Sequence, residues 1–447
     1  MSRLFYQSRL ERPALDRAMG IHMWDVTGKR YIDGSSGAMV SNIGHSNPVV
    51  LEAMRRQMEQ STFGYRLHFQ TDASEALAER LAELAPSGLG KVFFVSGGSE
   101  ATESAMKFAR QYALARGAAQ RYKIIARSPS YHGSTLGALS VTGYAPMTAP
   151  FDPMMRPMPK VPAPRAYLDG LDADDPATGA HYAQMLESRI LEEGPETVLA
   201  FMVEPVGGAS TGALVPPAGY MTAIREICDR YGVLLIHDEV MSSGGRTGRY
   251  MGGDHWADAA PDIICLSKGL GAGYVPLGAM IARDDMVEAV LDDGGFIHGH
   301  TYAGNPLACA AGVAVLDVIA ADGLMENAAR MGDLLQSGLR DLMQKYPLIG
   351  DVRGKGLLLA FELMQDRQSK APLPAGLNAH ARLVEIAYEN GLIIYSRRTR
   401  GGLSGDHFLV CPPMIVTAEE VEEITTLLDL SLGQFMAQLP DDLMRNA

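Results

Sequence analysis

The stretch that decides the fold is Asp262-Ile263-Ile264-Cys265-Leu266-Ser267-Lys268-Gly269-Leu270-Gly271-Ala272-Gly273-Tyr274. Four apolar residues follow the acid, which predicts a short buried strand, and a glycine-rich loop comes after it. Lys268 stands where the strand ends and the loop begins. A lysine amine held out of water loses its proton and can attack a carbonyl carbon, forming a Schiff base. Because a single lysine is most often a solvated surface residue, the other motifs decide between the two interpretations.

Apolar runs of strand length lie on both sides of this stretch, and helical patterns separate several of them. This alternation predicts an α/β domain with a mostly parallel sheet. The clearest helices are expected at residues 100–116 and 219–231. Residues 142–175 are rich in Pro, Met and Asp and are expected to form a surface excursion outside the core. The strand-like runs are residues 92–95, 123–126, 199–203, 233–236, 263–266 and 277–281.

Shorter patterns organise the two ends of the chain. Residues 21–34 predict a hairpin around Thr27-Gly28. Ser74 is expected to be the N-cap of a helix at residues 75–84. Further helices are predicted at residues 48–60, 306–321, 324–346 and 418–436, and further strands near residues 356–362 and 392–395.

Length and charge exclude several classes of protein. A chain of 447 residues is expected to form more than one domain. A net charge of −13 disfavours nucleic acid as a partner, which requires a basic face. We see no membrane-spanning run and no signal peptide. The four cysteines are far apart without metal-ligand spacing, which predicts buried thiols, no metal site and a cytoplasmic location; they are Cys228, Cys265, Cys309 and Cys411.

Polar residues follow several of the predicted strands. Ser96-Gly97-Gly98-Ser99 comes directly before a helix, where free N–H groups and the helix dipole form an anion site. Asp238 ends a buried strand, which is where open α/β sheets place ligand-binding groups. Tyr131 can stack on a flat ring, Thr301 can bind a phosphate, and Glu204 adds an acid at a strand end. Each motif taken alone also fits an ordinary structural role, as a helix start, a capping acid, a core aromatic residue or a helix-entry loop.

Taken together, these motifs match the requirements of pyridoxal 5′-phosphate. The cofactor needs a lysine for its aldehyde, a carboxylate at its pyridine nitrogen, an anion site for its phosphate and a stacking group. Asp238 precedes Lys268 by 30 residues, which is enough for one crossover between parallel strands. Both side chains can therefore reach the same edge of the sheet.

The chain resembles the class III pyridoxal-phosphate-dependent aminotransferases of fold type I. The matching stretches come in the order of the family, cover nearly the whole chain and are jointly very specific. They are Ser96-Gly97-Gly98-Ser99-Glu100-Ala101, Tyr131-His132-Gly133, Val203-Glu204-Pro205, Asp238-Glu239-Val240 with Gly245-Arg246-Thr247-Gly248, Ser267-Lys268-Gly269 with Pro276-Leu277-Gly278-Ala279, and His300-Thr301-Tyr302-Ala303-Gly304-Asn305-Pro306.

This resemblance implies a fold and an assembly. The fold is a large cofactor-binding domain with a mostly parallel seven-stranded sheet, and a small α+β domain built from both ends of the chain. We expect the boundaries at residues 1–60, 61–330 and 331–447. The family forms dimers with active sites at the subunit interface, so a homodimer or a dimer of dimers is expected.

The resemblance also implies residue roles. Lys268 carries the internal aldimine, and Asp238 pairs with the pyridinium nitrogen. The ring lies between Val240 and Tyr131. The other implied cofactor contacts are Gly98 and Ser99 at the phosphate, Thr301 at the phosphate of the neighbouring subunit, and His132 and Glu204.

The substrate pocket distinguishes branches of this family. The ornithine and GABA enzymes place an Arg shortly before a Pro-Pro pair, where this chain has Leu409 before Pro412-Pro413. The amine and ω-amino acid:pyruvate branch instead uses a mobile Arg further upstream. The candidates for a carboxylate-binding Arg are Arg397, Arg398 and Arg400, which precede Gly401-Gly402, although a solvated basic turn is the ordinary alternative.

Other pocket residues follow from rough alignment with that branch. Met39 stands where such enzymes often have Trp. The remaining pocket-wall candidates are Tyr65, Arg66, Phe5 and Tyr6.

We therefore expect ping-pong transfer of an amino group from an ω-amino acid, diamine or simple amine to pyruvate or a similar 2-keto acid. The alternatives are a class III aminomutase, racemase or decarboxylase, and a catalytically silent cofactor-binding protein. A nicotinamide dehydrogenase is disfavoured because no G-x-G-x-x-G follows the first strand.

Overall fold

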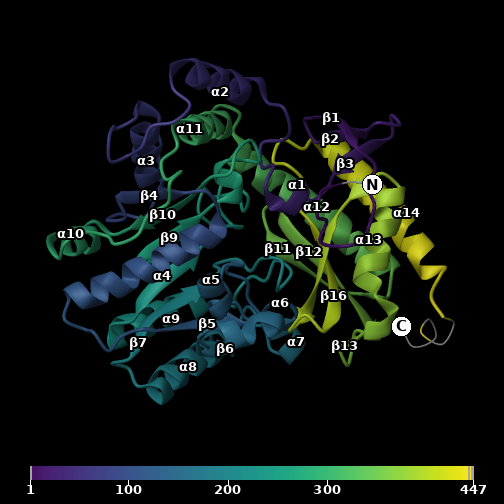
Figure 1. Ribbon diagram of the computed structural model, residues 1–447. Coiled ribbons are helices and arrows are strands. Elements are labelled where there is room, and N and C mark those ends of the chain that lie inside the picture. The colour runs from purple at the N-terminus through teal and green to yellow at the C-terminus, as the bar shows by residue number, and fades with distance from the viewer. Residues whose placement is uncertain (1–2, 441–442, 444–447) are drawn as a thin grey trace.

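A computed structural model describes residues 3–440 and 443 (Figure 1). Its centre is a seven-stranded sheet in the order β4-β10-β9-β8-β7-β5-β6. β10 runs antiparallel to both of its neighbours, and the other paired strands are parallel. The predicted fold class is therefore confirmed. The strands are β4 (Lys91–Val95), β5 (Lys123–Ser128), β6 (Lys160–Pro162), β7 (Val198–Val203), β8 (Leu234–Asp238), β9 (Ile263–Leu266) and β10 (Gly278–Ala282).

Helices cover both faces of this sheet, which is why its central strands are continuous apolar runs. Every residue of β7, β9 and β10 is buried. Along β9, Ile263 and Cys265 pack with α4 (Gly98–Ala115) and α10 (Asp284–Asp292), whereas Ile264 and Leu266 pack with α11 (Pro306–Ala321). This alternation is the two-residue period of a strand with two covered faces. The remaining covering helices are α2 (Pro48–Gln60), α3 (Asp72–Leu84), α8 (Pro176–Glu193) and α9 (Tyr220–Tyr231).

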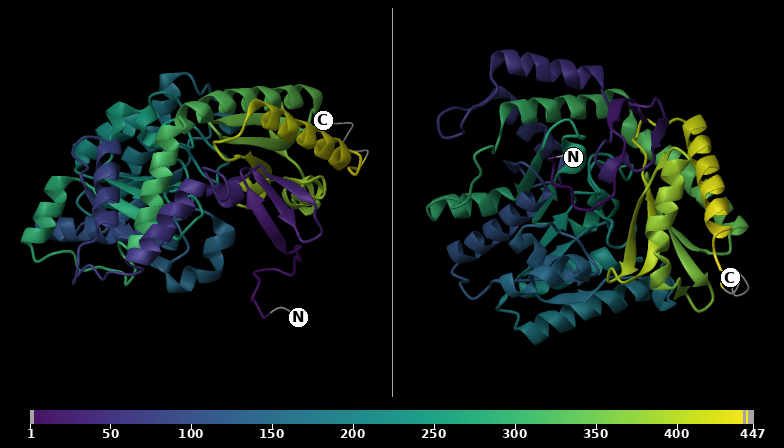
Figure 2. Two further views of the ribbon diagram at one scale, coloured as in Figure 1. Left: turned by 90° about the horizontal axis from the view of Figure 1, so that it is seen from above. Right: turned by 45° about the vertical axis from the view of Figure 1, so that its right-hand side comes forward.

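The two ends of the chain meet in a four-stranded sheet. The predicted hairpin forms β2 (His22–Asp25) and β3 (Arg30–Asp33), and β1 (Leu15–Met19) extends it. β14 (Leu392–Ile393) pairs parallel with β3. Figure 2 shows these N-terminal strands beside the C-terminal helix α14 (Ala418–Met436).

A third sheet belongs to the C-terminal part of the chain. Its order is β11-β12-β16-β15, and β13 pairs with β12. α12 (Leu324–Lys345) connects it to the large sheet, and α13 (Ala379–Glu389) packs near its β15 edge. The strands are β11 (Ile349–Lys355), β12 (Leu358–Asp366), β13 (Ala371–Pro372), β15 (Tyr395–Arg400) and β16 (Ser404–Val410).

Two local predictions are wrong. The helix α3 begins at Asp72 with Thr71 as its N-cap residue, and the Ser74 hydroxyl donates to the Thr71 carbonyl instead. Residues 142–175 are not only a surface excursion, because they contain β6 and the buried Val161 and Ala163 at the sheet edge. The short elements are α1 (Ser36–Met39), α5 (Leu136–Val141), α6 (Ala145–Thr148), α7 (Ala166–Asp169) and 3-10 turns at Ala149–Met154, Gly252–His255, Ala257–Ala259, Lys268–Leu270 and Ala375–Leu377.

One hydrophobic cluster joins Val50, Val315 and Phe435, one from each predicted segment of the chain. The domain boundaries at residues 60 and 330 stay predictions. All four cysteines are buried and free. Within the described residues, no single helix has the length and apolar character to cross a membrane, although α11 and α12 together, bent by 64°, meet the test by length and composition.

Candidate active site

Asp238 and Lys268 lie at the same edge of the large sheet. Asp238 is the last residue of β8, and its register partner on the neighbouring strand β9 is Cys265. Lys268 follows β9 by two residues. Since parallel strands end at a common edge, the crossover of 30 residues predicted from the sequence brings the carboxylate and the amine together.

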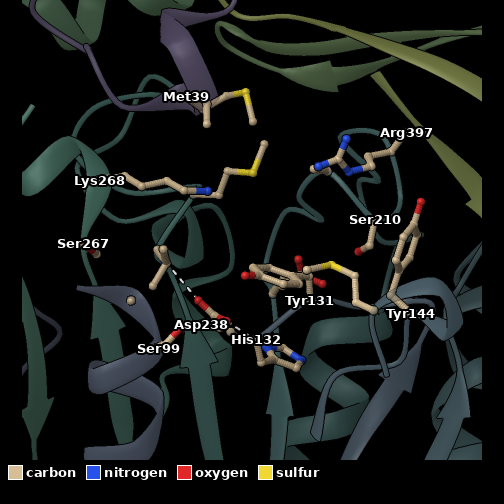
Figure 3. A pocket seen from close by; sticks show the side chains of 18 of the residues that line it. Met39, Ser99, Tyr131, His132, Tyr144, Ser210, Asp238, Ser267, Lys268 and Arg397 are labelled. Carbon is tan, nitrogen blue, oxygen red and sulfur yellow. Dashed lines mark hydrogen bonds and ion pairs between the residues drawn. The ribbon is translucent and has the colours of Figure 1, made fainter. Parts of the chain in front are cut away.

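The Lys268 amine is held in an environment that favours its neutral form. Its backbone is left-handed, with φ of 44°, because the chain turns sharply between β9 and the 3-10 turn that follows. Burial lowers the pKa of Lys268 below its usual range, although Asp238 and Glu204 act in the opposite direction. Figure 3 shows this side chain directed into a cavity.

Asp238 is oriented by two hydrogen-bond partners. His132 Nδ1 lies 2.7 Å from Asp238 Oδ2, and the Val240 N–H donates to Oδ1 at 3.1 Å. The backbone N–H of His132 donates to Thr142 Oγ1 at 2.9 Å, which fixes the loop carrying the imidazole. These contacts leave the carboxylate little freedom to rotate.

Glu204 lies directly after β7 and is 5% exposed. Its Oε1 accepts from the Gly208 N–H at 3.1 Å, whereas its Oε2 has no hydrogen-bond partner. Arg127 donates to the Glu204 carbonyl at 2.7 Å. Burial raises the pKa of the Glu204 carboxyl group.

The start of α4 forms a tight turn beside these groups. A Cβ at Gly98 would lie 2.9 Å from Val240 Cγ1, so only glycine fits there. A Cβ at Gly97 would meet nothing within 4 Å, and Gly97 makes no side-chain cap. The Ser99 hydroxyl accepts from the Ser134 N–H at 3.0 Å. Free N–H groups at the start of an 18-residue helix therefore border open space, which suits an anion.

The Lys268 amine, the Asp238 and Glu204 carboxylates and the start of α4 border one cavity of about 290 Å³. Figure 3 shows Lys268 on one side of it and Arg397, Ser210 and Tyr144 on the other, with Tyr131 between them. The predicted residues that line the cavity are Met39, Gly98, Ser99, Tyr131, His132, Glu204, Asp238, Val240, Lys268 and Arg397.

Strand register separates the three candidate arginines. They lie on β15, where Arg397 pairs with His407 and Arg398 pairs with Asp406 of β16. Arg397 faces the cavity. Arg398 donates to Asp406 Oδ1 at 3.1 Å, and Arg400 bonds the Lys370 carbonyl. The three arginines thus lie on a strand and not on the basic turn that was the ordinary alternative, and the two-residue period of the strand turns Arg398 and Arg400 away from the cavity.

The family described as aminotransferase class-III matches residues 6–432. The chain belongs to the class III aminotransferase family. It is 36% identical to an uncharacterized aminotransferase of Bacillus subtilis, over 96% of this chain and 97% of the relative. It is 33% identical to a putrescine–pyruvate aminotransferase of Pseudomonas aeruginosa, over 95% and 91%.

Solved structures agree with this assignment. An (S)-enantioselective omega-transaminase from Thermomicrobium roseum has a TM-score of 0.91 at 36% identity, with 97% of each chain covered. The omega-transaminase of Pseudomonas jessenii, solved in complex with PMP, has a TM-score of 0.90 at 34% identity, over 98% of this chain and 97% of that one. The protein is an aminotransferase that depends on pyridoxal phosphate and transfers an amino group from an amine donor to a keto acid acceptor.

The residues at the aminotransferase cavity fit this cofactor. A buried amine, a buried carboxylate and a glycine-rich helix start suit an aldehyde, a ring nitrogen and a phosphate respectively. His132 Nε2 and Glu204 Oε2 are buried without a hydrogen-bond partner within the described residues, as expected for groups beside a bound polar ligand.

Some predicted residues lie outside the aminotransferase cavity. Thr301 is exposed on the loop before α11. Arg66 is also exposed and donates to the His298 carbonyl at 3.3 Å, and Tyr65 packs on His68. Phe5 and Tyr6 are exposed in the N-terminal segment. Of these residues, Thr301 alone was predicted to contact a neighbouring subunit, and the roles of all five stay predictions.

Several cavity residues were missed by sequence reasoning. Tyr144 and Met147 come from the segment that was expected to be a surface excursion. The small-residue run Gly207-Gly208-Ala209-Ser210, just after the Glu204 motif, was a usable signal because such runs allow close approach to a ligand. The other missed lining residues are Ala38, Gly133, Val206, Met241, Ser267 and Tyr395.

Proposed function

We propose that this aminotransferase moves an amino group from an apolar amine, a diamine or an ω-amino acid to pyruvate. The observation that carries the proposal is that the Lys268 amine and the Arg397 guanidinium line the same cavity. The first group suits chemistry at an amine carbon, and the second suits an acceptor with a carboxylate. The name of the Pseudomonas aeruginosa relative supports pyruvate as that acceptor.

The cofactor would be held by residues at the ends of the strands β4, β5, β8 and β9, the last of which contributes Lys268. We assign the Gly98 and Ser99 region to its phosphate, Tyr131 and Val240 to the two faces of its ring, and Asp238 to its ring nitrogen. His132 would orient the Asp238 carboxylate through their 2.7 Å contact. When bound, pyridoxal phosphate supplies an aldehyde that condenses with amines and a ring that accepts an electron pair.

Lys268 would have two tasks. Its Nζ would hold the cofactor between reactions and, once released by the donor amine, would take a proton from the donor carbon and return it to a neighbouring carbon. Burial favours the neutral amine that this task needs. Asp238 would keep a negative charge at the ring nitrogen and so favour its protonated form. The same residues would run the second half of a ping-pong cycle in reverse.

The rest of the cavity would select the substrates. Arg397 would pair with the carboxylate of the keto acid, since a buried carboxylate without a partner is costly. Apolar side chains from Met39, Met147, Val206 and Met241 would receive the organic group of the donor. Met39 in place of a larger aromatic residue leaves room for a bulky donor.

We further propose that the enzyme works as a homodimer. Thr301 lies on an exposed loop next to Tyr302. The exposed ring of Phe63 packs edge-on against Tyr302, with 6.0 Å between the ring centroids. Leu67, Phe69 and Ile297 are also exposed. Apolar groups of this number suit a subunit interface, which would bring Thr301 to the partner's phosphate site.

A donor screen with pyruvate tests the proposal. Each amine, including putrescine, is incubated with the holoenzyme and pyruvate, and alanine and the carbonyl product are measured. We expect equal amounts of both. Carbon dioxide release, racemised donor or a rearranged amine without alanine would identify a decarboxylase, racemase or aminomutase instead. No change of the cofactor absorbance with any amine would indicate a catalytically silent protein.

A further inference from the structure

We propose that the Ser210 hydroxyl is a second carboxylate-binding group, which acts together with Arg397 to select keto acids over uncharged carbonyl compounds. This proposal rests on the proposed function, because it adds a residue to the same acceptor site. Ser210 lines the cavity but belongs to none of the sequence motifs that carry the family resemblance.

The first observation is that the Ser210 hydroxyl makes no hydrogen bond within the described residues. Ser210 is 3% exposed, and its Oγ has no hydrogen-bond partner within the described residues. A buried polar group without a partner destabilises the folded chain, so its presence beside a cavity calls for a ligand. Figure 3 shows Ser210 on the side of the cavity away from Lys268.

The second observation is that the loop carrying Ser210 is held rigidly. Arg353 on β11 donates to the Gly212 carbonyl at 2.7 Å and to the Thr211 carbonyl at 3.0 Å. Arg353 is itself paired with Glu362 on β12 at 2.9 Å. A hydroxyl on such a loop is held in place before the substrate binds, which reduces the entropic cost of binding.

The third observation is that Arg397 faces this same loop. His407, the register partner of Arg397, shares its face of the antiparallel pair. The His407 ring fills the space beside Gly212, where an added Cβ would lie 2.7 Å from Cδ2. β15, which carries Arg397, is therefore the edge strand of the same sheet against which the Ser210 loop packs.

A carboxylate suits this pair of donors. It has two oxygens and accepts several hydrogen bonds, and a guanidinium alone leaves part of that capacity unused. Tyr144 and Tyr395 also bring hydroxyls to the cavity, and the Tyr144 oxygen is already partnered because it accepts from the Arg398 N–H at 3.3 Å. Among the hydroxyls of the cavity residues, that of Ser210 alone is both shielded from solvent and without a hydrogen-bond partner within the described residues.

The test compares Ser210→Ala with wild-type holoenzyme. The first measurement is the dissociation constant for propanoate, a carboxylate that cannot react, followed through the cofactor absorbance. The second is the half-reaction of the aminated enzyme with pyruvate and with propanal, measured by stopped flow. We expect about 10-fold weaker propanoate binding and an equal loss with pyruvate, but less than about twofold change with propanal.

Two further readouts separate this role from a structural one. Removing an unpartnered buried hydroxyl should leave the Tm equal or higher, so stability and carboxylate affinity should move in opposite directions. Thr211→Val is the matched control, because it removes a hydroxyl from the same loop. The Thr211 hydroxyl donates to the Gly208 carbonyl, and Thr211 does not line the cavity. This control should keep the wild-type preference for pyruvate over propanal.

The outcomes distinguish the two proposals. Propanoate binding unchanged in Ser210→Ala, or equal losses with pyruvate and propanal, would overturn the role of Ser210. Wild-type enzyme that binds propanoate but forms no alanine from pyruvate would overturn the proposed acceptor alone.

Discussion

His132 Nδ1 lies 2.7 Å from Asp238 Oδ2, and this contact joins two residues that are 106 positions apart in the chain. Both side chains are nearly inaccessible to solvent. The imidazole thus fixes the carboxylate that we assign to the cofactor ring nitrogen.

Asp238→Asn should slow the half-reaction with an amine donor by roughly 100-fold or more, because it removes the charge that keeps the ring nitrogen protonated. The amide retains the shape of the carboxylate, so cofactor affinity should fall much less. Stopped-flow absorbance gives the rate, and titration of the apoenzyme gives the affinity. Turnover near the wild-type value would refute the assignment.

Lys268→Ala should bind the cofactor but turn over at least about a thousandfold slower, since one amine serves as nucleophile, base and acid. Borohydride treatment of the wild-type holoenzyme should fix the cofactor to a single peptide. Mass spectrometry identifies that peptide, and a label on a peptide without Lys268 would show that another lysine holds the cofactor.

Recombination of the apoenzyme with cofactor should depend on pH through Lys268. Only the neutral amine attacks the aldehyde, so the rate should rise with pH and level off below pH 10.5, the ordinary lysine pKa, because burial lowers the pKa of Lys268. The Asp238 carboxylate favours the protonated amine and raises that pKa. In Asp238→Asn the midpoint should therefore move to lower pH; an upward shift would contradict the proposed environment.

Arg397→Ala should raise the Michaelis constant for pyruvate by roughly 10- to 150-fold, the loss expected for a charge-assisted pair. Its half-reaction with an amine that lacks a carboxylate should change little. Arg398→Ala and Arg400→Ala are the matched controls, because both side chains bond backbone or Asp406 outside the cavity. Equal selectivity in all three variants would exclude Arg397 as the carboxylate partner.

Thr301→Val should weaken cofactor binding by about 10-fold if its hydroxyl reaches a phosphate in the partner subunit. Dilution of the wild-type enzyme below its dimer dissociation constant should release cofactor and activity together. Light scattering with a parallel activity assay checks this expectation. A monomer that retains both cofactor and activity would rule out a shared site.

The sequence by itself determined the α/β fold, the family and the residues at the centre of the cavity. These features depend on local patterns. An apolar run followed by Lys268, Asp238 or Gly98 can be recognised in the sequence without knowing how the strands pack together. The sequence does not predict the strand β6, since three residues at a sheet edge carry too weak a pattern. It also does not decide between Thr71 and Ser74 as the N-cap residue of α3, because both are hydroxyl residues and they lie only three positions apart.

Only the tertiary structure decided which polar groups share the cavity. The sequence left Arg397, Arg398 and Arg400 equivalent, and strand pairing separated them, because register with β16 sets the face on which each side chain lies. The position of Ser210 likewise depends on Arg353, 143 residues later in the chain. Contacts over such distances arise from packing between sheets, which no local pattern of residues encodes.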